Sequence, residues 1–163
     1  MRIEWLTPKN ISKTIPLCIE KKVGALKKKE WACKILKKMK SDFLGLIAFE
    51  NGKVLGALEF LPSLIVPYPL PEKNKKTAFI TCIYSLEERD CRKELILEFE
   101  KRIFKKGFKK ISVVSGVKKG FPNGPVDFFE NCGFKSSKIL DEVELAYGKE
   151  TLVFMEKECY SKC

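Results

Sequence analysis

The chain contains no histidine, which limits the chemistry that its side chains can perform. Histidine is the commonest general base and the usual partner of a nucleophilic serine or cysteine. General acid–base catalysis would therefore have to use glutamate, aspartate, tyrosine, cysteine, lysine or water. Structural zinc usually needs four cysteine or histidine ligands at short paired spacings, and the only tight cysteine pair is Cys159 and Cys163. We therefore expect no metal site.

The seven cysteines do not form the spacing of a redox motif or a disulfide framework. Their number is odd, no C-x-x-C pair occurs, and residues 1–10 contain no apolar stretch of signal-peptide length. No apolar run approaches the ~18 to 20 residues of a membrane span. We therefore expect reduced thiols that mostly fill the core of a cytoplasmic protein, with no membrane partner.

The net charge is +11, with 32 Lys and Arg against 21 Asp and Glu, and this favours anionic partners. The lysines come in short runs along the whole chain, which is typical of solvated helix faces and loops rather than of one basic arm. The sequence has no zinc-finger spacing, no RNP1-like aromatic strand and no Gly-rich clamp. It therefore does not favour nucleic acid as the partner, although phosphate neutralisation alone could give non-specific affinity.

The elements that must position any site can be predicted from hydrophobic patterning. At 163 residues, 45% hydrophobic and 33% charged, the chain is typical of one globular domain that spans residues 1–163. Residues 2–6 alternate weakly and predict a strand. Thr7 followed by Pro8 is typical of a helix start, and that helix should run to about Lys22. Residues 25–40 have the apolar spacing of an amphipathic helix.

The middle of the chain predicts a hairpin and a central strand. Residues 43–49 and 53–61 are two apolar runs around Asn51-Gly52, the strongest short signal for an antiparallel hairpin. The proline-rich stretch that follows, to Lys76, should be an extended connection. Its apolar part, residues 64–71, could line an acceptor cleft or form a homodimer contact, and the sequence does not separate these two. Residues 77–84 form a continuous apolar run typical of a strand buried on both faces.

The remaining sequence predicts a strand–helix–strand unit and a short helix before the last strands. A helical apolar stripe begins after Ser85 and ends at Gly107. A strand over residues 110–115 follows, parallel to the central strand or splayed from it. Pro125 can open a short helix that runs to Asn131. Residues 135–140 and 151–156 then predict two strands at an antiparallel edge.

This order of elements resembles the GNAT family of N-acetyltransferases. The best local matches are FLGLIAFENGKVLGALEF, the segment from TCIYSLEERDCRK to KKISVVS, and GPVDFFENCGF, where FFENCGF is similar to a family segment beside the thioester arm. The resemblance implies an α/β (α+β) acyl-CoA N-acyltransferase fold, with a central mixed, mostly antiparallel sheet flanked by helices. It also implies transfer of an acetyl group from acetyl-CoA to the primary amine of a small molecule or peptide.

The resemblance also implies which residues bind the cofactor. In the family, the fourth strand pairs with the pantetheine arm, and the following loop and helix start bind the pyrophosphate. Carried over, the strand positions are Cys82, Ile83, Tyr84 and Ser85. The remaining candidate cofactor contacts are the phosphate-binding Arg89, Arg92 and Lys93, and the aromatic Phe128 and Phe129 beside the thioester arm.

The pyrophosphate loop is where this sequence departs from the family. The family has glycines there, which let backbone N–H groups approach phosphate, whereas residues 86–93 contain none. Ser85 and Glu88 have the spacing of a capping box, and Glu87 and Asp90 place further negative charge at the expected helix start. These residues favour a helix N-terminus that its own side chains satisfy and that repels a phosphate. Against this, Arg89, Arg92 and Lys93 could donate to phosphate oxygens, so the sequence leaves both alternatives open.

The resemblance places the candidate catalytic groups on the two central strands. Glu59, near the end of the third strand, is the candidate general base, although a solvent-facing strand residue would look the same in the sequence. The family often has a tyrosine acid at the position of Phe129, so Tyr84 or Tyr147 would have to replace it. Cys82 and Cys132 are expected near the same cleft as packing residues.

Two functions remain open at this stage. The first is acetyl-CoA-dependent N-acetyl transfer by direct attack of the amine on the thioester. The second is a catalytically inactive protein of the same shape that serves as a binding or regulatory module for an acidic partner or nucleic acid. The glycine-free loop and Phe129 are the reasons for keeping the second.

Overall fold

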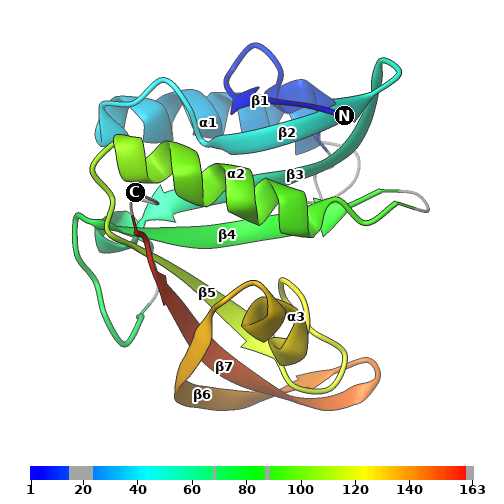
Figure 1. Ribbon diagram of the computed structural model, residues 1–163, viewed down its shortest axis with the longest axis vertical. Coiled ribbons are helices and arrows are strands. Elements are labelled where there is room, and N and C mark those ends of the chain that lie inside the picture. The colour runs from blue at the N-terminus through cyan, green and yellow to red at the C-terminus, as the bar shows by residue number, and fades with distance from the viewer. Residues whose placement is uncertain (15–23, 68, 87–88, 161–163) are drawn as a thin grey trace.

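The computed structural model describes residues 1–14, 24–67, 69–86 and 89–160 (Figure 1). Within them the chain forms one seven-stranded sheet in the order β1-β2-β3-β4-β5-β7-β6. The strands are β1 (Arg2–Leu6), β2 (Gly45–Glu50), β3 (Lys53–Pro62), β4 (Thr77–Ser85), β5 (Lys110–Gly116), β6 (Lys135–Leu145) and β7 (Gly148–Glu158). The helices are α1 (Gly24–Met39), α2 (Arg92–Lys105) and α3 (Val126–Asn131), with short 3₁₀ turns η1 (Ile11–Lys13) and η2 (Ser63–Ile65).

The sheet is mixed and mostly antiparallel. Every neighbouring pair of strands is antiparallel except β4 and β5, which are parallel. β4 has three strands on either side of it, as its continuous apolar sequence predicts. The strand–helix–strand unit from β4 through α2 to β5 is therefore confirmed.

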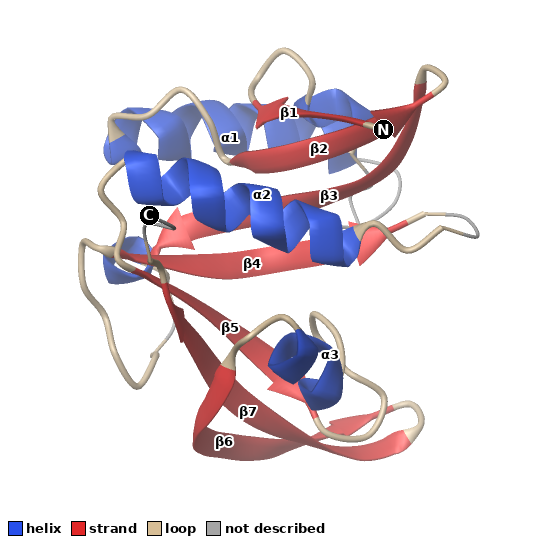
Figure 2. Ribbon diagram, in the orientation of Figure 1, coloured by secondary structure: helices blue, strands red, loops and turns tan. Residues whose placement is uncertain are grey.

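Helices cover both faces of the sheet (Figure 2). α2 and α3 lie on one face, where α2 buries the apolar stripe that its sequence predicts. α1 lies on the other face and buries Ala32 and Leu36, while Trp31 stays 38% exposed. The α2-side core contains Leu46, Leu58, Phe60, Ile80, Ile83, Leu95, Ile96 and Phe99, and the α1-side core contains Leu6, Ile47, Phe49, Ala57, Leu61, Phe79 and Tyr84.

The β2–β3 hairpin has the turn that its sequence predicts. Asn51 and Gly52 both have positive φ, 49° and 78°, which is the backbone of a type I′ turn. The two strands pair antiparallel from Glu50 and Lys53 outward. At the other end of α2, Gly107 has a φ of 90° and ends the helix as expected.

The predicted helix that begins at Pro8 is wrong over residues 8–14. The side chain of Asn10 accepts the N–H of Thr7 at 2.8 Å, and the Thr7 carbonyl accepts the N–H of Ile11 at 2.9 Å. These bonds close a turn that leads only into η1, and Thr14 is already extended, with φ −79° and ψ 151°. An asparagine side chain thus competes with the helical backbone here. The rest of that prediction, residues 15–22, lies outside the described residues.

The proline-rich connection between β3 and β4 is largely extended, as predicted, but it begins with η2. Ser63 anchors it, because its hydroxyl donates to the Asn74 carbonyl at 3.0 Å and accepts the Asn74 N–H at 2.9 Å. Glu72 accepts a bond from Lys110 on β5 at 2.9 Å. These contacts hold both ends of the connection against the sheet.

The last two strands are longer than predicted. β6 and β7 form a continuous hairpin that turns between Leu145 and Gly148, with two register shifts in β6. β6 is almost entirely exposed, so its side chains lack the alternation that would have marked its full length in the sequence.

Five cysteines within the described residues are unpaired. Cys91, Cys132 and Cys159 are buried and fill the core as expected, whereas Cys33 is exposed. Burial raises the pKa of Cys159 to about 12, so this thiol stays protonated. None of the helices in the described part of the chain is long and apolar enough to cross a membrane.

Candidate functional site

β4 and β5 diverge along their length in the middle of the sheet, and the region between their separating backbones is here called the opening (Figure 1). Residues 77–80 of β4 pair in parallel with residues 110–113 of β5, and the described ladder ends there. Beyond this point the two strands continue apart, with α2 beside β4 and α3 beside β5 on the same face of the sheet. Ligands commonly bind where neighbouring strands of a sheet separate, so this opening is the candidate site.

The edge of β5 that faces the opening is covered by the chain itself. The Asn123 amide donates to the Val114 carbonyl at 3.0 Å, and the Ser115 hydroxyl donates to the Gly124 carbonyl at 2.8 Å. A parallel bridge joins Gly116 to Pro125. The end of the β5–α3 loop therefore pairs with β5 where β4 no longer does.

β4 is bulged at the point where the strands separate. Glu59 lies opposite Cys82, but the next residue of β3, Phe60, lies opposite Ile80. Thr81 is therefore an extra residue in β4, a β-bulge that increases the local twist. The bulge turns the second half of β4 away from the direction of β5.

The second half of β4 directs backbone groups into the opening. Leu86 donates its N–H to Leu55, on the β3 side of the strand. Residues of an antiparallel pair alternate in direction, so Tyr84 also turns its N–H and C=O toward β3. The N–H and C=O groups of Ile83 and Ser85 therefore point away from β3, toward the diverging β5. These two residues offer the edge of a strand that an extended ligand could join.

Three of the predicted side chains meet on the α1 face of the sheet. Glu59 is directly opposite Cys82, and Tyr84 is opposite Ala57, two residues from Glu59 on the same face. Glu59 is only 8% exposed, so the alternative that it faces solvent is wrong. Tyr84 is 8% exposed, and Cys82 is half-buried beside the α1-side core. A carboxylate and a phenol thus lie on the same face of the sheet, the one that α1 covers.

The helix after β4 begins six residues later than predicted, so the capping box of Ser85 with Glu88 is wrong. α2 starts at Arg92, and Ser85 is the last residue of β4. The Ser85 hydroxyl accepts the N–H of Cys91 at 3.0 Å and donates to the Arg89 carbonyl at 2.8 Å. Ser85 therefore closes the loop before the helix instead of capping the helix. The loop acids Glu87 and Glu88 lie outside the described residues.

Asp90 and Arg92 form an ion pair at the start of α2. The Asp90 carboxylate accepts Arg92 Nε at 2.9 Å, Arg92 Nη2 at 2.6 Å and the Arg92 backbone N–H at 3.0 Å. The hydrogen bonds from Arg92 hold the pKa of Asp90 below its ordinary value, and the same pair raises the pKa of Arg92. The prediction that an acid lies at the helix start is therefore confirmed for Asp90.

The other two candidate cations are more exposed. Arg89 donates to Glu50 at 2.8 Å and lies 3.6 Å from Glu94. Lys93 is exposed on the first turn of α2. The three candidate cations thus lie in the loop before α2 and on its first turn, and Arg89 and Arg92 are paired with acids.

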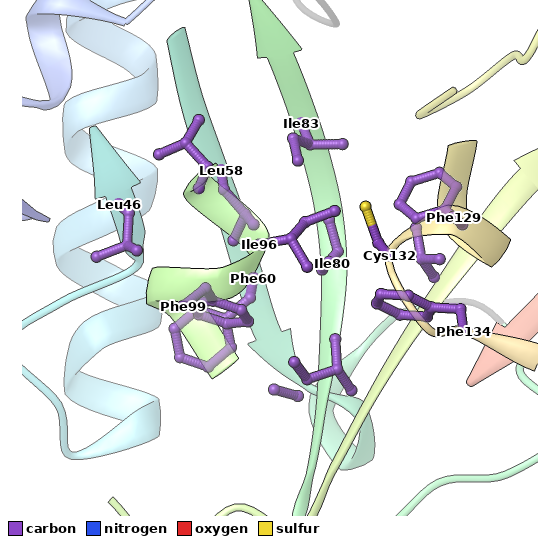
Figure 3. Packing of buried hydrophobic residues seen from close by; sticks show 14 of the residues in the cluster. Leu46, Leu58, Phe60, Ile80, Ile83, Ile96, Phe99, Phe129, Cys132 and Phe134 are labelled. Carbon is purple, nitrogen blue, oxygen red and sulfur yellow. The ribbon is translucent and has the colours of Figure 1, made fainter. Parts of the chain in front are cut away.

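The aromatic pair of α3 has two different environments. Phe129 is completely buried and packs with Ile83, Cys132 and Phe134 in the α2-side core, so its side chain does not line a surface open to a ligand (Figure 3). We therefore reassign Phe129 from the cofactor contacts to the core. Phe128 is half-buried and lies under the Arg92 guanidinium, whose central carbon is 4.4 Å from the ring centroid. Burial raises the pKa of Cys132, in keeping with a packing role.

No pattern in the sequence singles out Glu150, a carboxylate that accepts hydrogen bonds from three different residues. It is fully buried, and its oxygens accept the backbone N–H groups of Lys118 at 2.6 Å and Lys119 at 2.8 Å and the Tyr147 hydroxyl at 2.9 Å. Burial alone would raise the pKa of Glu150, but these hydrogen bonds outweigh it and lower the pKa to about 2. Glu150 is therefore ionised and holds the β5–α3 loop, and the Tyr147 proton is engaged in the same contact.

Comparison with known proteins gives a consistent fold. No protein-family model and no curated sequence matches the chain. The structure is similar to ribosomal-protein-alanine N-acetyltransferase from Brucella melitensis, with a TM-score of 0.67 and 15% identity over 97% of this chain and 99% of that chain. It is also similar to an acetyltransferase of the GNAT family from Streptococcus pneumoniae, with a TM-score of 0.69 and 12% identity over 98% and 99%.

A third similar structure was determined with a ligand. It is a protein from Salmonella typhimurium with its cofactor acetyl-CoA, with a TM-score of 0.68 and 13% identity over 100% of this chain and 96% of that chain. At these identities the similarity establishes the fold. The chain has the fold of the GNAT N-acetyltransferases, as the resemblance of its sequence implies.

Proposed function

We propose that this protein transfers an acetyl group from acetyl-CoA to a primary amine by direct attack of the amine on the thioester. The observation that carries the proposal is the opening between β4 and β5, where the backbone groups of Ile83 and Ser85 point away from β3 and the Glu59 carboxylate lies on the α1 face of the same sheet. Neighbours with the same fold are N-acetyltransferases by name, and one of them contains acetyl-CoA.

The residues around the opening fit an extended, phosphorylated cofactor in their chemistry. The backbone groups of Ile83 and Ser85 suit the amides of a pantetheine arm, because both partners present alternating donors and acceptors. Arg89, Arg92 and Lys93 suit the phosphates, to which guanidinium and ammonium groups make charge-assisted hydrogen bonds. The ring of Phe128, which contacts the Arg92 guanidinium, would keep that side chain in place.

Glu59 and Tyr84 are the proposed acid–base groups. An amine is protonated at neutral pH and must lose a proton before it attacks, and Glu59 would accept that proton directly or through water. The thiolate that leaves needs a proton, which the Tyr84 hydroxyl would supply. Both side chains lie on the α1 face, so the amine would approach from that side while the cofactor occupies the α2 side.

The acceptor is proposed to be the amine of a small molecule or of a peptide. The proposal does not extend to nucleic acid or to a membrane as partner. A homodimer formed through the apolar segment of the β3–β4 connection would supply further contacts to the acceptor. The five unpaired cysteines support a reducing, cytoplasmic setting.

A titration with acetyl-CoA by calorimetry at two salt concentrations tests the proposal, with ATP as the control polyanion. We expect saturable binding with a Kd near or below ~100 μM that ATP does not reproduce, because a specific site recognises more than charge. Binding that ATP matches and that high salt abolishes would contradict the proposal.

One observation favours a second function. Arg92 and Arg89 are both paired with acids of the chain itself, Asp90 and Glu50, so part of the phosphate-binding charge is already neutralised. A protein that kept the fold and lost the cofactor would serve as a binding or regulatory module for an acidic partner or nucleic acid. The same titration separates the two functions, because the module would show no specific binding of acetyl-CoA.

A further inference from the structure

Arg92 connects α2, which follows β4, with α3, which follows β5. It belongs to the first turn of α2, yet its guanidinium lies on the ring of Phe128 from α3, 4.4 Å from the centroid. Its Nη1 atom is so close to Gly124 that a Cβ added there would lie 3.3 Å away. The guanidinium therefore lies against α3 and the end of the β5–α3 loop. Its remaining fork, Nε and Nη2, is occupied by Asp90.

We infer that the Asp90 carboxylate occupies the phosphate-binding edge of Arg92 and competes there with the pyrophosphate of the cofactor. This inference rests on the proposed function. Carboxylates and phosphates bind the same fork of a guanidinium through two parallel hydrogen bonds, so one anion must leave before the other binds. Asp90 thereby sets the affinity of the site for phosphorylated ligands.

The ion pair has the properties of a contact that can be exchanged. The Asp90 side chain is 49% exposed and the Arg92 side chain 25%, and ion pairs exposed to this degree are weak. Asp90 lies in the loop just before α2, so its carboxylate can rotate into solvent without moving the helix. The contacts of the guanidinium with Phe128 and Gly124 do not depend on Asp90, so they remain when Asp90 turns away. An incoming phosphate would therefore find Arg92 already oriented.

The variant Asp90→Asn removes the negative charge of the Asp90 side chain and keeps its shape. Asparagine keeps the side-chain oxygen that accepts the Arg92 N–H, and it makes this local bond to the second residue along the chain as readily as aspartate does. It removes the negative charge that competes with phosphate. Asp141→Asn is the matched control, because Asp141 is an exposed acid on β6 that makes only a local bond to the next residue's N–H, and the change in net charge is the same.

Calorimetry at low salt should show that Asp90→Asn binds acetyl-CoA about threefold or more tightly than the unaltered protein, while Asp141→Asn binds with unchanged Kd. Pantetheine, which lacks the phosphates, should bind equally to all three proteins. Binding by Asp90→Asn alone would also support the inference, because removal of the competing charge would then have restored the site.

Other outcomes overturn the inference in distinguishable ways. Equal or weaker binding of acetyl-CoA by Asp90→Asn would mean that Asp90 orients Arg92 and does not compete, while the proposed function would stand. A gain that Asp141→Asn shares would be an effect of net charge. If none of the three proteins binds acetyl-CoA at low salt, the proposed function fails and the inference fails with it.

Discussion

Replacing Glu59 by glutamine removes a base and keeps the shape of the side chain. If Glu59 accepts the proton of the incoming amine, the turnover number at neutral pH should fall tenfold or more, because a positioned general base contributes at least that much. The KM for acetyl-CoA should change little, since Glu59 lies on the α1 face and not at the start of α2. Steady-state kinetics with a saturating amine measure both quantities.

Glu4→Gln on β1 is the control for this substitution. Glu4 is a carboxylate whose side chain is 41% exposed and pairs with Arg2, so its loss changes the charge by the same amount outside the opening. Unchanged turnover in Glu59→Gln would exclude Glu59 as the base. Tyr84 would then be tested next, as Tyr84→Phe.

Single residues also show where sequence reasoning stops. The position of Glu59 on β3 was predictable, because the strand boundaries follow from the hairpin signal, but its burial was not. Ser85 and Glu88 have the spacing of a helix cap, yet Ser85 binds Cys91 and Arg89 across a loop. A spacing of three residues does not distinguish a cap from a loop closure when distant strands set the direction of the chain.

At the scale of elements, the β5–α3 loop depends on one carboxylate. Glu150→Gln replaces an acceptor-only side chain by one whose NH₂ group faces backbone donors, so the contacts of Lys118 and Lys119 are weakened. We expect the thermal unfolding midpoint at pH 7 to fall by several degrees. The KM for acetyl-CoA should also rise, because the loop carries Gly124 and leads into α3 beside Arg92.

The pH dependence of stability provides a second measurement of this contact. The pKa of Glu150 is about 2 in the fold against an ordinary 4.5, so the folded state binds fewer protons than the unfolded state between these values. Its contribution is complete above pH 4.5 and is lost as the pH falls from 4.5 toward 2. Glu150→Gln should therefore lose less stability over this range, whereas the control Glu142→Gln, exposed on β6, should follow the unaltered protein. Parallel acid denaturation curves for all three proteins would contradict this role.

The elements themselves were largely predictable, but the divergence of β4 from β5 was not. Alternation, the Asn51-Gly52 turn and the stripe of α2 are local patterns, and each predicted the element that forms. The opening between β4 and β5 arises from the Thr81 bulge and from Asn123 bonded to the edge of β5. The bulge depends on the pairing of β4 with β3, and the Asn123 bond joins residues nine positions apart, so neither follows from the local alternation of apolar residues.

Over the whole molecule, the net charge is unevenly distributed along the chain, and the boundary lies directly before β5. Residues 1–109 contain 24 Lys and Arg against 13 Asp and Glu, whereas residues 110–163 contain eight of each. The entire net charge of +11 therefore belongs to the part with β1 to β4, α1 and α2. α1 contributes strongly, with Lys29, Lys34, Lys37 and Lys38 exposed. The short lysine runs of the sequence thus become a regional asymmetry once the chain is folded.

This asymmetry predicts the kind of amine that reacts best. The proposed acceptor side is the face covered by α1, so an acceptor that carries negative charge near its amine should be attracted and a polycation should be repelled. We expect kcat/KM for an acidic peptide to exceed that for its lysine-rich counterpart by about tenfold at low salt, and the difference to shrink at high salt. The double variant Lys34→Glu with Lys38→Glu should reduce this preference, and Lys135→Glu with Lys138→Glu on β6 should leave it unchanged. Equal use of both peptides at low salt would mean that contacts within the opening, and not the charge around it, select the acceptor.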